Sequence, residues 1–381
     1  MTPKERVAIA LRGGKPDRIP IVPIYDMGYV CNSTGADLRM WDLCSADEKI
    51  RIIEENFLLH QGIDGCFVHV GHNDDAATYL QVEKFPDYWR VTDTRTGEQW
   101  GLLPDRSRCA SDGQPIALQG DVLNWESRIQ SEADIERIVG PAPTPEKIEK
   151  DGRHWPLRRL SQKYPDYHFS FQTGTPMVFA LNACGGYVEG LTLMASEPAL
   201  FHKLLRRVTE HQCAQMATGK QAGGDSTWFT SYYTGADTIS PETYAEMIFP
   251  YEREICQEAK AQGLFVLNWY LGDLMPNLDK VLELPLDALV LEQGRKGYDI
   301  DPVEIRQRVG PKFCLFGFGY ENDYCTFNRA GLTGELQRQI KGAGLDGAFI
   351  AGTPIMPPNA LPAAVDYYFS EARRLGDYGK R

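Results

Sequence analysis

Short apolar runs alternate along the chain with longer stretches in which apolar residues recur every three or four positions. The runs predict buried strands over residues 19–24, 65–70, 168–172, 226–231, 264–268, 288–292, 313–317 and 348–351. The longer stretches predict amphipathic helices after these strands. Strands that are almost continuously apolar and alternate with helices are typical of a parallel sheet covered by helices on both faces.

Local signals mark the ends of the first helices. Thr2 with Glu5 forms a capping box and Gly13 ends that helix, while Ser45 with Glu48 forms a second capping box. Eight strands, each followed by a helix, predict an α/β fold of the (β/α)8 TIM-barrel type. A doubly wound open sheet is the alternative, but no Gly-x-Gly-x-x-Gly turn follows any predicted strand to support it.

The alternation is interrupted once, between about residues 83 and 143. This part of the chain is rich in turn residues, and short pieces of it have the alternating character of strands. We expect a small excursion after the second barrel strand, packed over the mouth of the barrel. Because α/β barrels of this length are commonly one domain, residues 1–381 are predicted to form a single barrel domain.

Composition narrows the class of protein. The formal net charge is −12, which argues against nucleic acid as a partner because its phosphates are bound largely by lysine and arginine. No apolar run approaches the roughly 20 residues of a membrane span, and the first residues lack the apolar core of a secretion signal. The nine cysteines include no Cys-x-x-Cys pair, so neither a disulfide framework nor a local zinc knuckle is expected. These features predict a cytoplasmic protein that acts on a small molecule.

The barrel fold itself points to candidate functional residues, because barrel enzymes place them at the carboxyl ends of the strands. We expect catalysis from His69, His72, Glu292 and Asp26, and substrate contacts from Tyr25, Tyr29, Gln172, Trp228, Tyr232, Asn268, Trp269 and Tyr320. Such aromatic density suits a flat or apolar substrate whose polar groups are positioned by tyrosine hydroxyls. For any single aromatic residue, capping of the barrel core is an equally good interpretation.

Three of the candidates, on two segments, stand in the most reactive surroundings. His69 ends the second predicted strand, His72 follows it, and an imidazole can act as acid, base or metal ligand near neutral pH. A hydrogen-bonded structural histidine is the alternative. Glu292 closes an otherwise apolar strand and therefore needs a partner. A salt bridge between Glu292 and Arg295 or Lys296 is its structural interpretation.

Five segments of the chain match sequence motifs of a known protein superfamily. They are Thr2-Pro-Lys-Glu-Arg-Val, Pro16-Asp-Arg-Ile-Pro20, Gly224-Asp225, Ser240-Pro-Glu-Thr-Tyr and Gly352-Thr-Pro-Ile-Met-Pro-Pro-Asn-Ala-Leu-Pro362. Together they resemble the uroporphyrinogen-decarboxylase-like superfamily along nearly the whole chain, and this resemblance implies a (β/α)8 barrel. It does not decide the reaction, because the superfamily holds cofactor-free porphyrinogen decarboxylases and corrinoid-linked methyltransferases.

Departures from the family patterns reduce the number of reactions that we expect for this chain. The resemblance implies two arginines after the first strand that clamp substrate carboxylates, and this chain has Tyr25 and Tyr29 there, which cannot form bidentate charged pairs. The zinc-dependent methyltransferases use His-x-Cys after the fifth strand and Cys after the eighth, whereas residues 267–273 and 352–355 contain neither residue type. Zinc of that kind is not expected. An oxygen-rich metal site that uses His69 with Glu292 and Glu321 is an alternative hypothesis.

The resemblance and its departures imply a corrinoid-linked methyltransferase of the demethylating kind. It would move a methyl group from a small methyl ether or related donor to cobalamin carried by a partner corrinoid protein. A cofactor-free decarboxylase or lyase acting on a small acid is one alternative, and a barrel that binds ligands without turnover is another. The oligomeric state is left open, a homodimer included.

Overall fold

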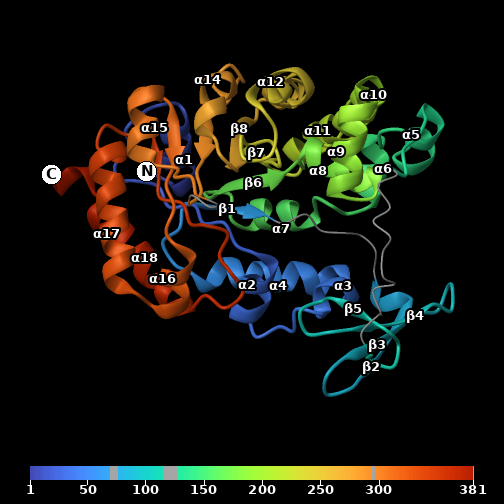
Figure 1. Ribbon diagram of the computed structural model, residues 1–381. Coiled ribbons are helices and arrows are strands. Elements are labelled where there is room, and N and C mark those ends of the chain that lie inside the picture. The colour runs from blue at the N-terminus through green and yellow to red at the C-terminus, as the bar shows by residue number, and fades with distance from the viewer. Residues whose placement is uncertain (69–75, 115–126, 294–296, 381) are drawn as a thin grey trace.

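The computed structural model describes residues 1–68, 76–114, 127–293 and 297–380. A curled parallel sheet lies at its centre (Figure 1). In spatial order its seven strands are β1 (Gly65–Val68), β6 (His168–Gln172), β7 (Ser226–Tyr232), β8 (Phe265–Leu271), β9 (Ala288–Val290), β10 (Cys314–Phe316) and β11 (Phe349–Ile350). Each strand pairs in parallel with its neighbours. The sequence predicted these seven strands, with ends that differ by a few residues.

The first predicted strand, residues 19–24, is not a regular strand, so the eight-stranded barrel is not confirmed. Its segment forms isolated parallel bridges, Ile21 with Ala351 and Tyr25 with Met356. The Asp64 N–H donates to the Ile21 carbonyl oxygen at 2.7 Å, just before β1. The segment thus contacts both edges of the sheet. Prolines at positions 20 and 23 remove two of its N–H donors, which explains why no continuous ladder forms.

Helices surround the sheet (Figure 1). They are α1 (Pro3–Leu11), α2 (Met27–Ser33), α3 (Met40–Leu43), α4 (Ala46–Leu59), α5 (Glu132–Ile138), α6 (Pro145–Lys150), α7 (Trp155–Lys163), α8 (Pro176–Cys184), α9 (Tyr187–Ser196), α10 (Pro198–Cys213), α11 (Met216–Gln221), α12 (Pro241–Thr243), α13 (Phe249–Ala261), α14 (Leu278–Val281), α15 (Pro302–Val309), α16 (Glu321–Thr326), α17 (Arg329–Gln339) and α18 (Pro362–Leu375). A π-helical turn, Tyr244–Ile248, joins α12 to α13. The predicted capping box at the first helix is confirmed.

Alternate residues of each strand face opposite sides of the sheet. Inward side chains such as Trp228, Leu267 and Phe316 form one apolar cluster, which α1 joins through Val7, Ala10 and Leu11. Outward side chains pack instead with the surrounding helices, and they include Phe229, Val266, Leu289, Leu315 and Phe349. The interior of the curled sheet is therefore a packed apolar core beneath the carboxyl ends of the strands.

A separate antiparallel sheet occupies part of the predicted excursion. Its strands, in order, are β2 (Leu80–Lys84), β3 (Trp89–Asp93), β4 (Gln99–Leu102) and β5 (Arg108–Cys109). It has its own small core in which Trp89, Val91 and Leu102 pack with Leu43 of α3. Figure 1 shows this sheet projecting beyond α3, away from the parallel strands. An excursion over the barrel mouth is therefore not confirmed.

Among the described residues, no single helix is long and apolar enough to cross a membrane, although α8 and α9, bent by 97° at their junction, pass that test as a pair.

A buried ion cluster connects the N-terminal segment to the sheet. The Asp64 side chain is fully buried and accepts hydrogen bonds from Arg6 at 2.5 Å and from Arg18 at 2.7 and 2.9 Å. It also accepts from the Ile21 N–H at 2.8 Å. Arg6 donates to Asp17 as well, which lowers the pKa of that carboxyl. One carboxylate thus joins α1, the irregular edge segment and the start of β1.

Replacement of Asp64 should therefore destabilise the whole sheet. We expect Asp64→Ala to lower the free energy of unfolding by about 3–5 kcal/mol, because the Arg18 guanidinium loses the carboxylate that it binds and buried Arg6 keeps only Asp17. Asp279, which pairs with Arg308 and is highly exposed, provides the control, and Asp279→Ala should cost less than about 1 kcal/mol. Urea denaturation measures both. Equal losses in the two variants would contradict the role of the buried cluster.

Candidate functional site

A cavity of about 450 Å³ lies at the carboxyl ends of the parallel strands. Strands β6 to β9 and the loops after them provide most of its lining, which comprises Gln172, Thr175, Val178, Trp228, Thr230, Tyr232, Tyr233, Asp237, Thr238, Trp269, Tyr270, Leu271, Gly272, Glu292, Gln293, Tyr298, Ile300 and Ile355. A cavity of this volume and mixed lining is typical of a small-molecule site. Its position is the one that the fold assigns to catalytic groups in α/β barrels.

Two tryptophans form the deep wall of this cavity. Trp228 on β7 and Trp269 on β8 face inward from neighbouring strands, with ring centroids 5.5 Å apart and planes tilted by 55°. They are 6% and 3% exposed. Neither indole N–H has a hydrogen-bond partner among the described residues. Below them Phe67 contacts the Trp228 ring edge-on at 5.4 Å, so the wall continues into the apolar core.

Tyrosines line the mouth of the cavity. Tyr232 and Tyr233 follow each other at the end of β7, and their ring centroids are 4.0 Å apart. Tyr187 of α9 lies 4.9 Å from the Tyr233 ring. Tyr233 has φ of 63°, in the left-handed region that bulky residues rarely adopt. Backbone strain of this kind is concentrated at functional sites.

Glu292 brings a carboxylate to the same cavity. It follows β9, is 3% exposed and lies in the lining with Gln172 and Thr230. Arg295 and Lys296, the partners considered for it, lie outside the described residues. The cavity therefore combines aromatic faces, uncharged polar groups and a buried carboxylate.

A polar network supports the cavity wall from the helix side. The Asn268 side-chain amide donates to Ser231 Oγ at 2.7 Å, and the Ser231 hydroxyl donates to Glu252 Oε1 at 2.8 Å. The Tyr244 hydroxyl donates to Glu252 Oε2 at 2.7 Å. Burial of Glu252 raises its pKa to about 7, against the opposing effect of these hydrogen bonds. Asn268 thus points away from the cavity lined by its neighbour Trp269.

The sequence reasoning missed Glu252, although a signal was present. On α13 the buried positions Glu252, Ile255, Cys256 and Ala259 follow helical spacing. A carboxylate at such a position is unusual, because an ionised group on an apolar helix face requires partners.

Tyr25 and Tyr29 lie apart from the cavity lining. Their rings stack at 5.3 Å, and both are buried. Tyr29 Oη is 2.7 Å from His60 Nε2, and His60 Nδ1 is 2.8 Å from Asp366 Oδ1. Because a carboxylate only accepts, Nδ1 carries the proton and Nε2 accepts from Tyr29. Burial lowers the pKa of His60. This chain of hydrogen bonds joins α2, α4 and α18.

The remaining candidates are spread over several elements. The Asp26 carboxylate caps α2 by accepting from the Gly28 N–H at 2.6 Å. Tyr320 is largely exposed at the start of α16, and Glu321 is the first residue of that helix. Neither belongs to the described lining of the cavity. His69 and His72 lie outside the described residues. Within the described residues, no group of three or more His, Cys, Asp or Glu side chains could hold a metal ion.

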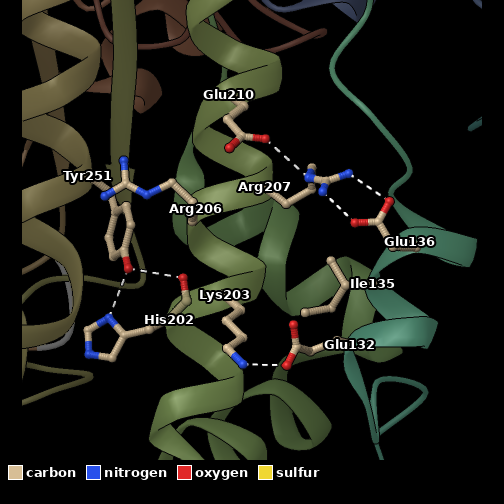
Figure 2. Close-up of a pocket in the computed structure, with 9 residues that line it drawn as sticks. All are labelled: Glu132, Ile135, Glu136, His202, Lys203, Arg206, Arg207, Glu210 and Tyr251. Carbon is tan, nitrogen blue, oxygen red and sulfur yellow. Dashed lines mark hydrogen bonds and ion pairs between the residues drawn. The ribbon is translucent and has the colours of Figure 1, made fainter.

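A second hollow, of about 430 Å³, lies between α5 and α10 and is crowded with charged side chains (Figure 2). Its basic side chains are paired with acidic ones, as Lys203–Glu132, Arg206–Glu254, Arg207–Glu136 and Arg207–Glu210. Three of these ion pairs connect α10 with α5 or α13, and Arg207–Glu210 lies within α10. Their charges are compensated within the protein, so the cavity at the strand ends is the better candidate site.

A family model and curated relatives assign this chain to the same family. The family model of uroporphyrinogen decarboxylase (URO-D) matches residues 127–353, more than half of the chain. The uroporphyrinogen decarboxylase of Chlorobaculum parvum is 26% identical over 211 residues, 54% of this chain and 57% of that protein. The enzyme of Chlorobium luteolum is 28% identical over 201 residues, 50% of this chain and 53% of that protein. The chain thus spans about half the length of these curated relatives.

A solved structure resembles the fold over nearly the whole chain. It is a methyltransferase from Methanosarcina mazei, with a TM-score of 0.67 and 13% identity, and the match covers 98% of this chain and 99% of that one. At this identity the likeness shows a common fold.

The raised pKa of Glu252 predicts a pH dependence of stability. Between the ordinary pKa of 4.5 and the folded value of about 7, only the unfolded chain ionises. Stability should therefore fall as pH rises through this window, by on the order of 3 kcal/mol. Glu252→Gln should remove this loss, so that its stability relative to wild type improves from pH 5 to pH 8. Urea unfolding at several pH values measures the difference.

The neighbouring surface residue Glu254 provides the matched control for this measurement. Glu254 lies on the same helix as Glu252 and pairs with Arg206 of α10. Glu254→Gln should leave the slope between pH 5 and pH 8 unchanged. An unchanged slope in Glu252→Gln would show that Glu252 is ionised in the folded protein throughout.

Proposed function

The chain belongs to the uroporphyrinogen decarboxylase family, and from that premise we propose that it is a corrinoid-linked methyltransferase. It would take a methyl group from a small methyl ether or a related donor and pass it to cobalamin carried by a partner corrinoid protein. The observation that carries this proposal is the aromatic character of the cavity at the strand ends.

The size and lining of the cavity favour a small donor over a porphyrinogen. A volume of about 450 Å³ suits a small ligand, whereas a tetrapyrrole with eight carboxylates is far bulkier and needs cationic partners. The charged side chains of the described lining are Asp237 and Glu292, both acidic. Tyr25 and Tyr29, which stand where the family carries its arginine clamp, pack against His60 instead.

The same volume indicates how the two substrates would meet. Cobalamin is too large for the cavity, so it would stay on its partner protein and approach the mouth at Tyr232 and Tyr233. The methyltransferase of Methanosarcina mazei has the same fold, which makes methyl transfer compatible with this architecture.

The chain's own residues would orient the donor and manage a proton. Trp228 and Trp269 would hold the donor in the cavity, away from bulk water. As the methyl–oxygen bond breaks, the oxygen keeps the bonding electron pair and takes a proton, for which Glu292 is the candidate donor. His69 and His72 remain candidates for the same role.

Demethylation with an added corrinoid partner tests the proposal. We expect methoxybenzenes to be converted to phenols only when the reduced corrinoid protein is present. Glu292→Gln should lower the rate by roughly 10²- to 10⁴-fold, the usual contribution of general acid catalysis. Glu283, a surface carboxylate paired with Lys280, gives the control variant Glu283→Gln, whose rate should match wild type. Phenol release followed by chromatography measures all three.

The competing decarboxylase function has a distinct signature. Release of carbon dioxide from small acids in the absence of a corrinoid protein, with no phenol formed from any methoxybenzene, would overturn methyl transfer and favour the activity of the named relatives.

A further inference from the structure

The helix that follows β6 begins at the wall of the cavity. Its cap residue Thr175 and its third residue Val178 both line that cavity. The first helical residue is Pro176, which has no N–H, and no described residue accepts a hydrogen bond from the N–H groups of Met177 and Val178. The first turn of a helix carries unpaired N–H donors and a partial positive charge. The start of α8 therefore favours a negatively charged group of a ligand.

Two threonine hydroxyls in the same lining have no partner among the described residues. Thr175 is 5% exposed and Thr230 of β7 is 7% exposed. The Thr175 hydroxyl does not cap α8, whereas that of Thr2 caps the first helix. Neither threonine oxygen is among the unpartnered polar atoms that are sealed from solvent. Both side chains are thus almost buried, yet their hydroxyls remain accessible from the cavity and free to bind.

Gln172 adds a free amide to the same part of the wall. It ends β6, is half-buried and lines the cavity, and its amide forms no hydrogen bond with a described residue. The strand register pairs Gln172 with Trp228, and Thr230 follows Trp228 two positions later on the same face of β7. The amide and the Thr230 hydroxyl therefore belong to diagonal neighbours on adjacent strands. Neutral donors gather where β6 leads into α8.

The acidic residues of the lining stand at other parts of the wall. Glu292 follows β9, and β7 and β8 separate that strand from β6. Asp237 lies in the loop after β7, where its carboxylate accepts from the Asp273 N–H at 2.9 Å. A ligand that spans the cavity would thus place an anionic end at α8 and its reacting oxygen toward Glu292.

We infer that the start of α8, together with Thr175, Thr230 and Gln172, is a carboxylate-binding subsite of the cavity, and that the methyl donor is an aromatic acid such as a methoxybenzoate. The inference rests on the proposed function, because it names a further group on the donor that occupies the same cavity. A carboxylate only accepts hydrogen bonds, so it can use every donor at this place. The subsite needs no cationic side chain, and the described lining contains none.

A matched pair of ligands isolates the recognition of the carboxylate. Para-methoxybenzoate and para-methoxybenzamide have nearly the same shape, and the second carries a neutral amide in place of the carboxylate. The quantity to measure is the ratio of the two Kd values, obtained by calorimetric titration of the full chain. Thr175→Val and Thr230→Val keep a branched side chain of similar size and remove the hydroxyl. Because neither hydroxyl bonds to a described residue, we expect both variants to fold.

We expect wild type to prefer para-methoxybenzoate over the amide, and this preference to fall roughly tenfold in each variant, as the loss of one hydrogen bond to a charged group predicts. Thr192, which is exposed on α9 outside the cavity lining, gives the control Thr192→Val, whose ratio should equal wild type. Far-ultraviolet circular dichroism establishes that each variant is folded, and either cavity variant alone is sufficient for the test.

The outcomes separate this inference from the proposed function. An unchanged ratio in the folded variants, or no preference of wild type for the carboxylate, would overturn the subsite. If methoxybenzene is then demethylated as fast as para-methoxybenzoate, methyl transfer stands without the subsite. A reduced ratio without any demethylation in the presence of a corrinoid protein would support the subsite and reject methyl transfer.

Discussion

The sheet depends on one buried carboxylate at the start of β1. Asp64 accepts from Arg6, from Arg18 and from the backbone of Ile21, and so holds α1 and the irregular edge segment against the first strand. That segment cannot rely on a regular ladder, because its prolines provide no N–H donors. Charge pairing in a buried setting replaces the missing backbone hydrogen bonds.

The cavity is a consequence of strand alternation. Along β8, Trp269 faces inward and becomes part of the wall, while Asn268 faces the helices and joins the network with Ser231 and Glu252. One strand therefore provides both the surface that meets a ligand and the hydrogen bonds that keep this surface in place. Burial raises the pKa of Glu252 to about 7, so the support behind the wall is expected to respond to pH although Glu252 does not line the cavity.

The chain belongs to the uroporphyrinogen decarboxylase family. This membership does not determine the substrate, because one fold can carry different side chains at its site. The parallel sheet and its helices determine where a ligand binds, and side chains at a few strand ends determine which ligand it is. In this chain the cavity lining carries tryptophan, tyrosine and uncharged polar groups together with the carboxylates of Asp237 and Glu292. Tyr25 and Tyr29, at the positions where the resemblance implies an arginine clamp, lie in the core, and Tyr29 completes a hydrogen-bonded chain through His60 to Asp366. The aromatic lining of the cavity is the feature on which the proposal of a small, flat ligand rests.

The sequence by itself determined most of the strands, although it also predicted a regular strand over residues 19–24 that does not form. Strands β1 and β6 to β11 were predicted because a short apolar run is a local pattern that does not depend on tertiary contacts. The cap at Thr2 likewise depends only on residues three positions apart. The sequence also identified Trp228, Trp269 and Glu292 as neighbours, since parallel strands end at one edge. Only the tertiary structure decided which aromatic side chains reach the cavity and which, like Tyr25 and Tyr29, enter the core. It likewise decided that Glu252 is buried and that His60 meets Asp366, a contact across 306 positions of the chain. These outcomes depend on which face of an element packs against another, and that is determined by contacts between distant segments that no local pattern contains.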